Sequence, residues 1–211
     1  MNKPLLDFNT ETVNSITHAL GILFGIIFIP LLINRSFDHN TTVQISGVVI
    51  YGFCFMITFV LSTLFHFFQR PGLKQKLRLL DHISIYFLIA ATYTPFVLKY
   101  MYNTKGTILL SLVWCFAITF IYLKLNYYNR FAIFSVISYV FIGLLFLLVR
   151  KSFFANMPAE VIRFIYIGVV LYLLGIIFLL WQKWKHHHAI WHLFVLAGGI
   201  CHFRAIWLSV T

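Results

Sequence analysis

The sequence predicts an all-α integral membrane protein, a seven-transmembrane helix bundle, on three observations. Of the 211 residues, 61% are apolar and only 10% are charged, whereas a soluble domain carries about a quarter charged residues. The apolar residues form seven runs, each close to the length of about 20 residues that spans a bilayer. The runs are continuously apolar rather than alternating, which favours helices over membrane strands. We therefore expect one seven-helix transmembrane domain over residues 1–211.

The seven expected spans follow one another with short connections. In chain order they are Asn14–Asn34, Val43–Phe68, Leu79–Leu98, Thr107–Leu123, Phe131–Val149, Val161–Trp181 and His188–Leu208. Each must be helical, because a helix satisfies its own backbone groups in lipid. The first run is too long for the apolar core of a signal peptide, so we expect it to be retained. The longest connection, Gln69–Arg78, is interpreted as a basic loop that begins at Pro71-Gly72.

The charge distribution predicts the orientation of the chain. Sixteen Lys and Arg face five Asp and Glu, a formal charge of +11. The basic residues are scattered between apolar runs rather than gathered on one solvated face, which argues against nucleic-acid partners. The N-terminus and the even-numbered connections carry nine of them against seven on the other side, with the densest group at Arg70–Arg78. Because basic residues accumulate in cytoplasmic loops, we expect a cytoplasmic N-terminus.

Polar side chains inside the expected spans are the functional candidates, because burying them in lipid is costly. Spans one, three and seven run in one direction and span two returns, so most of these side chains fall at the same membrane face. They are His18, Ser62, His66, Asp81, His82, His188 and His192. His202 and Arg204 lie deeper, His202 about 15 Å beyond His192 at 1.5 Å per residue.

The spacing of His188 and His192 suggests a metal site. Residues at i and i+4 share one helix face, with Cβ atoms about 5–6 Å apart, so two imidazoles can converge on one ion. His66 can supply a third nitrogen from span two. Three histidines with one open position are typical of catalytic zinc, and no cysteine pair lies nearby to complete a structural site. A hydrogen-bonded polar cluster that only packs the helices is the alternative.

Asp81 and Ser62 are the candidate catalytic residues beside these histidines. A carboxylate at an apolar boundary must be paired or protonated, and Asp81 could serve as general base toward a metal-bound water. It could equally be an acid that opens a helix and faces its dipole. Ser62 shares a helix face with His66, where it could orient the water or bond back to its own helix. The other acids, Glu11 among them, are expected near the terminus or in loops.

A polar stripe leads into the first span. Glu11, Asn14 and His18 recur at i, i+3 and i+7, so they lie on one face of a helix. They could line the mouth of the same pocket, or they could simply mark the start of the helix.

Taken together, these motifs resemble the hemolysin III family, the bacterial branch of the progestin and adipoQ (adiponectin) receptor superfamily. The matching residues, in order, are Glu11-x-x-Asn14-x-x-x-His18, Ser62-x-x-x-His66, Asp81-His82, His188-x-x-x-His192 and His202-Phe203. The resemblance implies seven helices with a cytoplasmic N-terminus in the bacterial plasma membrane. It also implies Zn2+ on His66, His188 and His192, with Asp81 reaching zinc through a water and Ser62 beside it. The chain lacks the long N-terminal domain of the animal receptors, so hormone binding is not carried over.

The resemblance leaves three hypotheses for function. Relatives include alkaline ceramidases, so the first is a zinc-dependent hydrolase of lipid amides or esters, with membrane lipids as partners and a role in membrane-lipid homeostasis. The bacterial family is named for haemolysis, so the second is a pore-forming or channel protein. The third is a non-enzymatic sensor of membrane state with structural zinc, which would use the same three ligands as the hydrolase.

Overall fold

The computed structural model describes residues 8–126, 132–181 and 183–210. These residues form helices and no strand, which confirms the predicted fold class. The elements are α1 (Phe8–His39), α2 (Thr42–Phe67), α3 (Pro71–Tyr100), α4 (Thr104–Asn126), α5 (Ala132–Gly143), the short 3-10 helix η1 (Leu145–Val149), α6 (Arg150–Phe154), α7 (Ala159–Leu180) and α8 (His187–Ser209). Seven spans among them are long and apolar enough to cross a membrane. Phe131, the first residue of the fifth expected span, lies outside the described residues.

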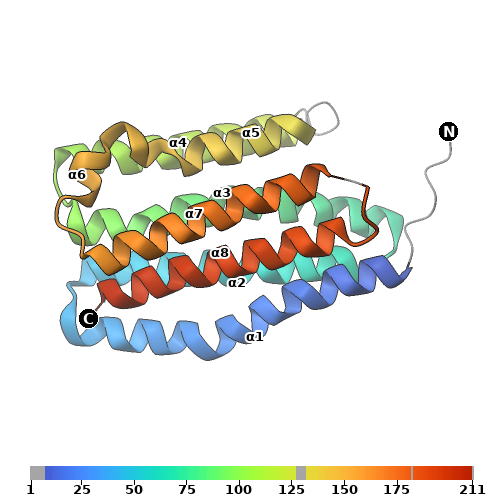
Figure 1. The fold of residues 1–211 in the computed structure, drawn as a ribbon, viewed down its shortest axis with the longest axis horizontal. Coiled ribbons are helices and arrows are strands. Elements are labelled where there is room, and N and C mark those ends of the chain that lie inside the picture. Colours follow the sequence, from blue (N-terminus) through green and yellow to red (C-terminus); the bar gives the residue numbers. More distant parts are fainter. Residues whose placement is uncertain (1–7, 127–131, 182, 211) are drawn as a thin grey trace.

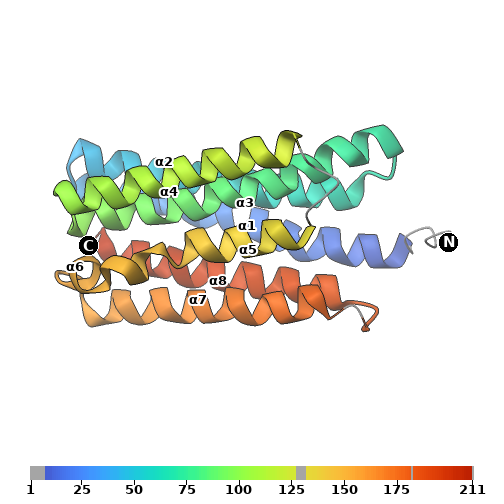
Figure 2. The ribbon, with the colours of Figure 1, turned by 90° about the horizontal axis from the view of Figure 1, so that it is seen from above.

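The helices lie side by side as one bundle (Figures 1 and 2). α2 packs between α1 and α3, α4 packs on α3, and α7 and α8 form a close pair. α3 and α8 are the most enclosed spans, with 56% and 50% of their most apolar stretches buried, against 22% for α4 and for α7. α1 begins at one end of the bundle and the C-terminus lies at the other (Figure 1), as an odd number of spans requires.

The prediction of a basic loop over Gln69–Arg78 is wrong, because residues 71–78 belong to α3. The helix begins at Pro71, which occupies its first turn, where the fixed φ of proline and its missing N–H are tolerated. The Lys, Gln, Leu and Arg residues that follow are good helix formers. Asp81 therefore lies ten residues inside α3 rather than at its start. An interaction with the helix dipole cannot explain Asp81, because that effect fades within the first turn.

The fifth span is broken, whereas the sequence predicts a continuous helix. α5 ends at Gly143, the 3-10 helix η1 follows with a tighter winding, and α6 then returns to an α-helix. The Tyr93 hydroxyl of α3 lies 3.0 Å from the carbonyl oxygen of Ile142 and 2.8 Å from that of Gly143, and it accepts a hydrogen bond from the Phe146 N–H at 3.3 Å. Backbone groups freed inside a membrane need such partners. Tyr93 thus stabilises the break from a neighbouring helix.

Candidate metal centre

Three histidines from two distant parts of the chain meet at one end of the bundle. His66 is in the last turn of α2, and His188 and His192 are in the first turns of α8. One nitrogen from each ring lies within 4.8 Å of the others, and the ring centroids are 4.5–5.1 Å apart. His66 and His192 are buried and His188 is half-buried. We call these residues the three-histidine cluster.

Two rings of the cluster are held by oxygen atoms on one side. His66 donates its Nδ1–H to Glu11 Oε2 at 2.9 Å. His192 Nδ1 lies 3.1 Å from the backbone oxygen of Asn14 and 3.2 Å from the Thr17 hydroxyl. Because carboxylate and carbonyl oxygens only accept, the Nδ1 atoms carry the protons and each Nε2 keeps its lone pair.

The free nitrogens fit a divalent metal. Nε2 of His66 and of His192 is buried and has no hydrogen-bond partner among the described residues. Metal-binding histidines almost always donate the other ring N–H to a carboxylate or a backbone carbonyl, as both do here. With the nitrogens of the three rings within 4.8 Å of one another, the cluster could hold one metal ion.

Glu11 lies inside the bundle rather than in a terminal segment or a loop. It was expected near the terminus or in a loop, but α1 begins at Phe8 and carries it into the bundle, where it is 4% exposed. Its Oε2 also accepts a hydrogen bond from Lys74 Nζ of α3 at 2.8 Å. The signal for this role was the stripe of Glu11, Asn14 and His18, which faces the three-histidine cluster rather than merely opening a helix.

Ser62 and Asp81 lie beside the cluster. Ser62 is one turn before His66 on α2; its hydroxyl is buried and makes no hydrogen bond among the described residues, although it is close enough to interact with Asp81. Asp81 is buried on α3 and lines a cavity. His82, the next residue, is not part of the three-histidine cluster, and its charged neighbours include Arg78 and Lys124.

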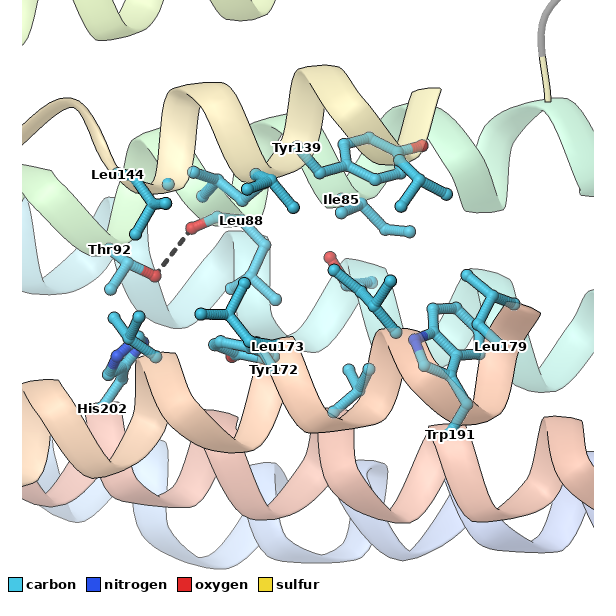
Figure 3. Close-up of a pocket in the computed structure, with 18 of the residues that line it drawn as sticks. Ile85, Leu88, Thr92, Tyr139, Leu144, Tyr172, Leu173, Leu179, Trp191 and His202 are labelled. Carbon is cyan, nitrogen blue, oxygen red and sulfur yellow. Dashed lines mark hydrogen bonds between the residues drawn. The ribbon is translucent and has the colours of Figure 1, made fainter. Parts of the chain in front are cut away.

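A mostly apolar cavity of about 150 Å³ begins at this site and runs along the bundle. His18 and Asp81 line one end, and Thr92 and His202 line the other. Thr92 lies eleven residues after Asp81 on α3, which corresponds to about 17 Å along the helix. Figure 3 shows the cavity with α5 above it and α7 and α8 below. His202 thus faces the interior, whereas Arg204 is exposed on the outside of α8.

These features define a multi-pass helical membrane protein with a candidate metal centre at one end of an internal cavity. The profile of the family described as Haemolysin-III related matches residues 6–203, and the chain belongs to this family. This confirms the resemblance seen in the motifs.

Individual relatives agree with this assignment. The chain is 35% identical over 196 residues to "Hemolysin-3" of Bacillus cereus, covering 93% of this chain and 90% of the relative. It is also 35% identical to the "Hemolysin-3 homolog" of Bacillus subtilis (strain 168), covering 93% and 92%. A human protein, "Monocyte to macrophage differentiation factor", is 28% identical over 207 residues, covering 93% and 83%.

Proposed function

We propose that this protein is a metal-dependent hydrolase that cleaves an amide or ester bond of a membrane lipid. The observation that carries the proposal is that the three-histidine cluster lies beside an apolar cavity: His18, whose ring stacks on that of His192, lines this cavity together with Asp81. The Nε2 atoms of His66 and His192 have no hydrogen-bond partner among the described residues. A metal site that only joined the helices would need neither such a cavity nor the buried carboxylate of Asp81 that lines it.

The three-histidine cluster would hold the ion, which we propose to be zinc. Bound there, it would supply activation of water at neutral pH and polarisation of an acyl carbonyl. Glu11 and the backbone oxygen of Asn14 keep the rings of His66 and His192 in the tautomer that presents Nε2.

Asp81 and Ser62 would carry the proton transfers and the polar contacts of the reaction. Asp81 takes the proton of the attacking water and returns it to the leaving amine or alcohol, the role of a general base and then a general acid. The Ser62 hydroxyl, which lies beside Asp81, would donate a hydrogen bond to the acyl oxygen.

The substrate would lie with its acyl chain in the cavity and its polar end at the cluster. The residues between the two ends of the cavity are mostly aliphatic and aromatic, among them Leu88, Tyr139 and Leu173 (Figure 3). Such a lining fits a hydrocarbon chain. Because the cavity lies between α5 and α7, a lipid could reach it sideways from the bilayer.

The cavity also weighs against the rival functions. A channel needs a polar path along its length, whereas the residues that line this cavity are mostly aliphatic and aromatic. A sensor with structural zinc would use the same ligands but would not need Asp81 or Ser62. We further propose that the protein resides in the bacterial plasma membrane, as its similarity to the bacterial family suggests, and that its N-terminus lies in the cytoplasm, as the charge distribution suggests.

The test compares variants of the purified protein in lipid nanodiscs. We expect wild type to bind one zinc ion per chain and to release free fatty acid from an N-acyl or ester lipid, detected by mass spectrometry. Asp81→Asn should keep the ion and lose at least about a hundredfold in rate, and the triple variant His66→Ala/His188→Ala/His192→Ala should lose both. His39→Ala, an exposed histidine at the far end of α1, is the matched control. Full turnover by Asp81→Asn would refute the proposal.

A further inference from the structure

His18 is a buried polar side chain that neither the metal site nor the proposed proton transfers use. It is in α1, is 2% exposed, and neither ring nitrogen has a hydrogen-bond partner among the described residues. Burying an unsatisfied polar atom is costly, so two in one ring need an explanation. Its contacts and its place in the cavity supply one.

The packing of His18 makes it unsuitable as a fourth metal ligand. Its ring stacks on that of His192, with centroids 3.7 Å apart and planes 28° from parallel. Lone pairs of imidazole lie in the ring plane, so nearly parallel stacked rings do not direct them at one point. Accordingly, the nitrogens that gather within 4.8 Å come from the three-histidine cluster and do not include His18.

The same packing fixes where the ring can form hydrogen bonds. Phe59 of α2 contacts it edge-on with centroids 5.1 Å apart, and Trp191 of α8 lies 6.4 Å away. These aromatic neighbours offer no acceptor to His18. His18 also lines the cavity, together with Asp81 and Trp191, so a ligand in the cavity can reach its ring.

We propose that His18 is the polar anchor of the lipid in the cavity, hydrogen-bonding the carbonyl or hydroxyl group that ends the hydrocarbon chain. A neutral imidazole offers one N–H donor and one acceptor nitrogen, which suits a hydroxyl, and its donor suits a carbonyl. The ligand is a neutral long-chain lipid with such a group at one end. The proposal rests on the proposed function for its ligand, and it makes His18 a positioning residue that sets the depth of the reacting carbonyl beside the cluster.

The experiment measures binding rather than turnover, with two brominated probes, 12-bromododecan-1-ol and 1-bromododecane. Bromine quenches tryptophan fluorescence, and the part of the quenching that disappears in Trp191→Phe reports binding in the cavity. In wild type we expect the alcohol to bind about tenfold more tightly than the bromoalkane, because one further hydrogen bond is made. His18→Phe keeps a stacked ring without nitrogens and should abolish this preference without weakening the bromoalkane.

Two more variants keep the test decisive. His18→Gln retains a donor and an acceptor and should keep most of the preference for the alcohol. His18→Met also removes both ring nitrogens, and its flexible side chain can adapt to the site if phenylalanine does not pack there. Zinc content should equal that of wild type in every His18 variant. The proposal is overturned if zinc is lost from His18→Phe or His18→Met, if the preference for the alcohol survives in them, or if wild type binds neither probe. Absence of lipid hydrolysis, with the His18-dependent preference intact, would refute the proposed function alone.

Discussion

Replacing Glu11 by glutamine should weaken metal binding without unfolding the protein. Glu11 Oε2 joins His66 Nδ1 at 2.9 Å to Lys74 Nζ at 2.8 Å, so one buried carboxylate orients a ring and pairs with a cation. Glutamine is nearly the same size but uncharged, and it turns a charge-assisted hydrogen bond into a neutral one of about half the strength. We therefore expect the side chain to stay in place and the His66 ring to be held less firmly.

The size of the effect follows from the strength of that bond. A charge-assisted hydrogen bond contributes about 1.5–3 kcal/mol and a neutral one about 1 kcal/mol. The difference, about 1 kcal/mol, corresponds to a loss of up to about tenfold in metal affinity. Glu11→Ala removes the partner altogether and should cost up to about a hundredfold, the upper range for residues that support a metal ligand.

The assay is competition for zinc between the purified protein and a chromophoric chelator. Glu160→Gln is the matched control, because Glu160 is an exposed glutamate whose partner is Arg163 at the surface. Its zinc affinity should equal that of wild type, since exposed ion pairs contribute little. Zinc binding by both Glu11→Gln and Glu11→Ala as tight as wild type would refute the role assigned to this carboxylate.

Three further predictions concern the cavity and the helix packing. Leu173→Trp fills part of the cavity and should lower lipid turnover at least tenfold at unchanged zinc content. Leu174→Trp should leave turnover unchanged, because Leu174 is similarly exposed but does not line the cavity. Equal rates for the two variants would show that the cavity is not the substrate site. Tyr93→Phe should lower the stability to thermal unfolding by about 1–3 kcal/mol because the break after α5 loses its hydroxyl partner, and the exposed Tyr102→Phe should not. Gly106→Ala should lower the free energy of unfolding by more than about 1 kcal/mol, since a Cβ at this position meets the backbone oxygen of Met101. Gly72→Ala is the control, because a Cβ there meets open space. Similar melting temperatures for the two variants would contradict this packing.

The sequence was sufficient for the number of spans and for the meeting of the histidines. Long apolar runs can only be helices in lipid, so counting them predicted the bundle. Once the spans alternate in direction, His66 at the end of one must lie at the same face as His188 and His192 at the start of another. The four-residue spacing of His188 and His192 on α8 predicted that both rings lie on one helix face.

What the sequence could not supply were features set by neighbouring helices. The break after Gly143 depends on a hydroxyl from Tyr93, some 50 residues away in the chain, and nothing in the apolar run itself predicts it. The start of α3 at Pro71 was not predicted, because Pro-Gly is typical of loops, although proline is also frequent in the first turn of a helix. The burial of Glu11 follows from its contacts with α2 and α3, which local spacing only hinted at.

The most direct test of the account is X-ray absorption spectroscopy of the zinc-loaded protein. We predict a coordination shell of three imidazole nitrogens and one oxygen at about 2.0–2.1 Å, which is lost when His66, His188 and His192 are replaced together. A shell containing sulfur, or an unchanged spectrum and zinc content in the triple variant, would contradict it.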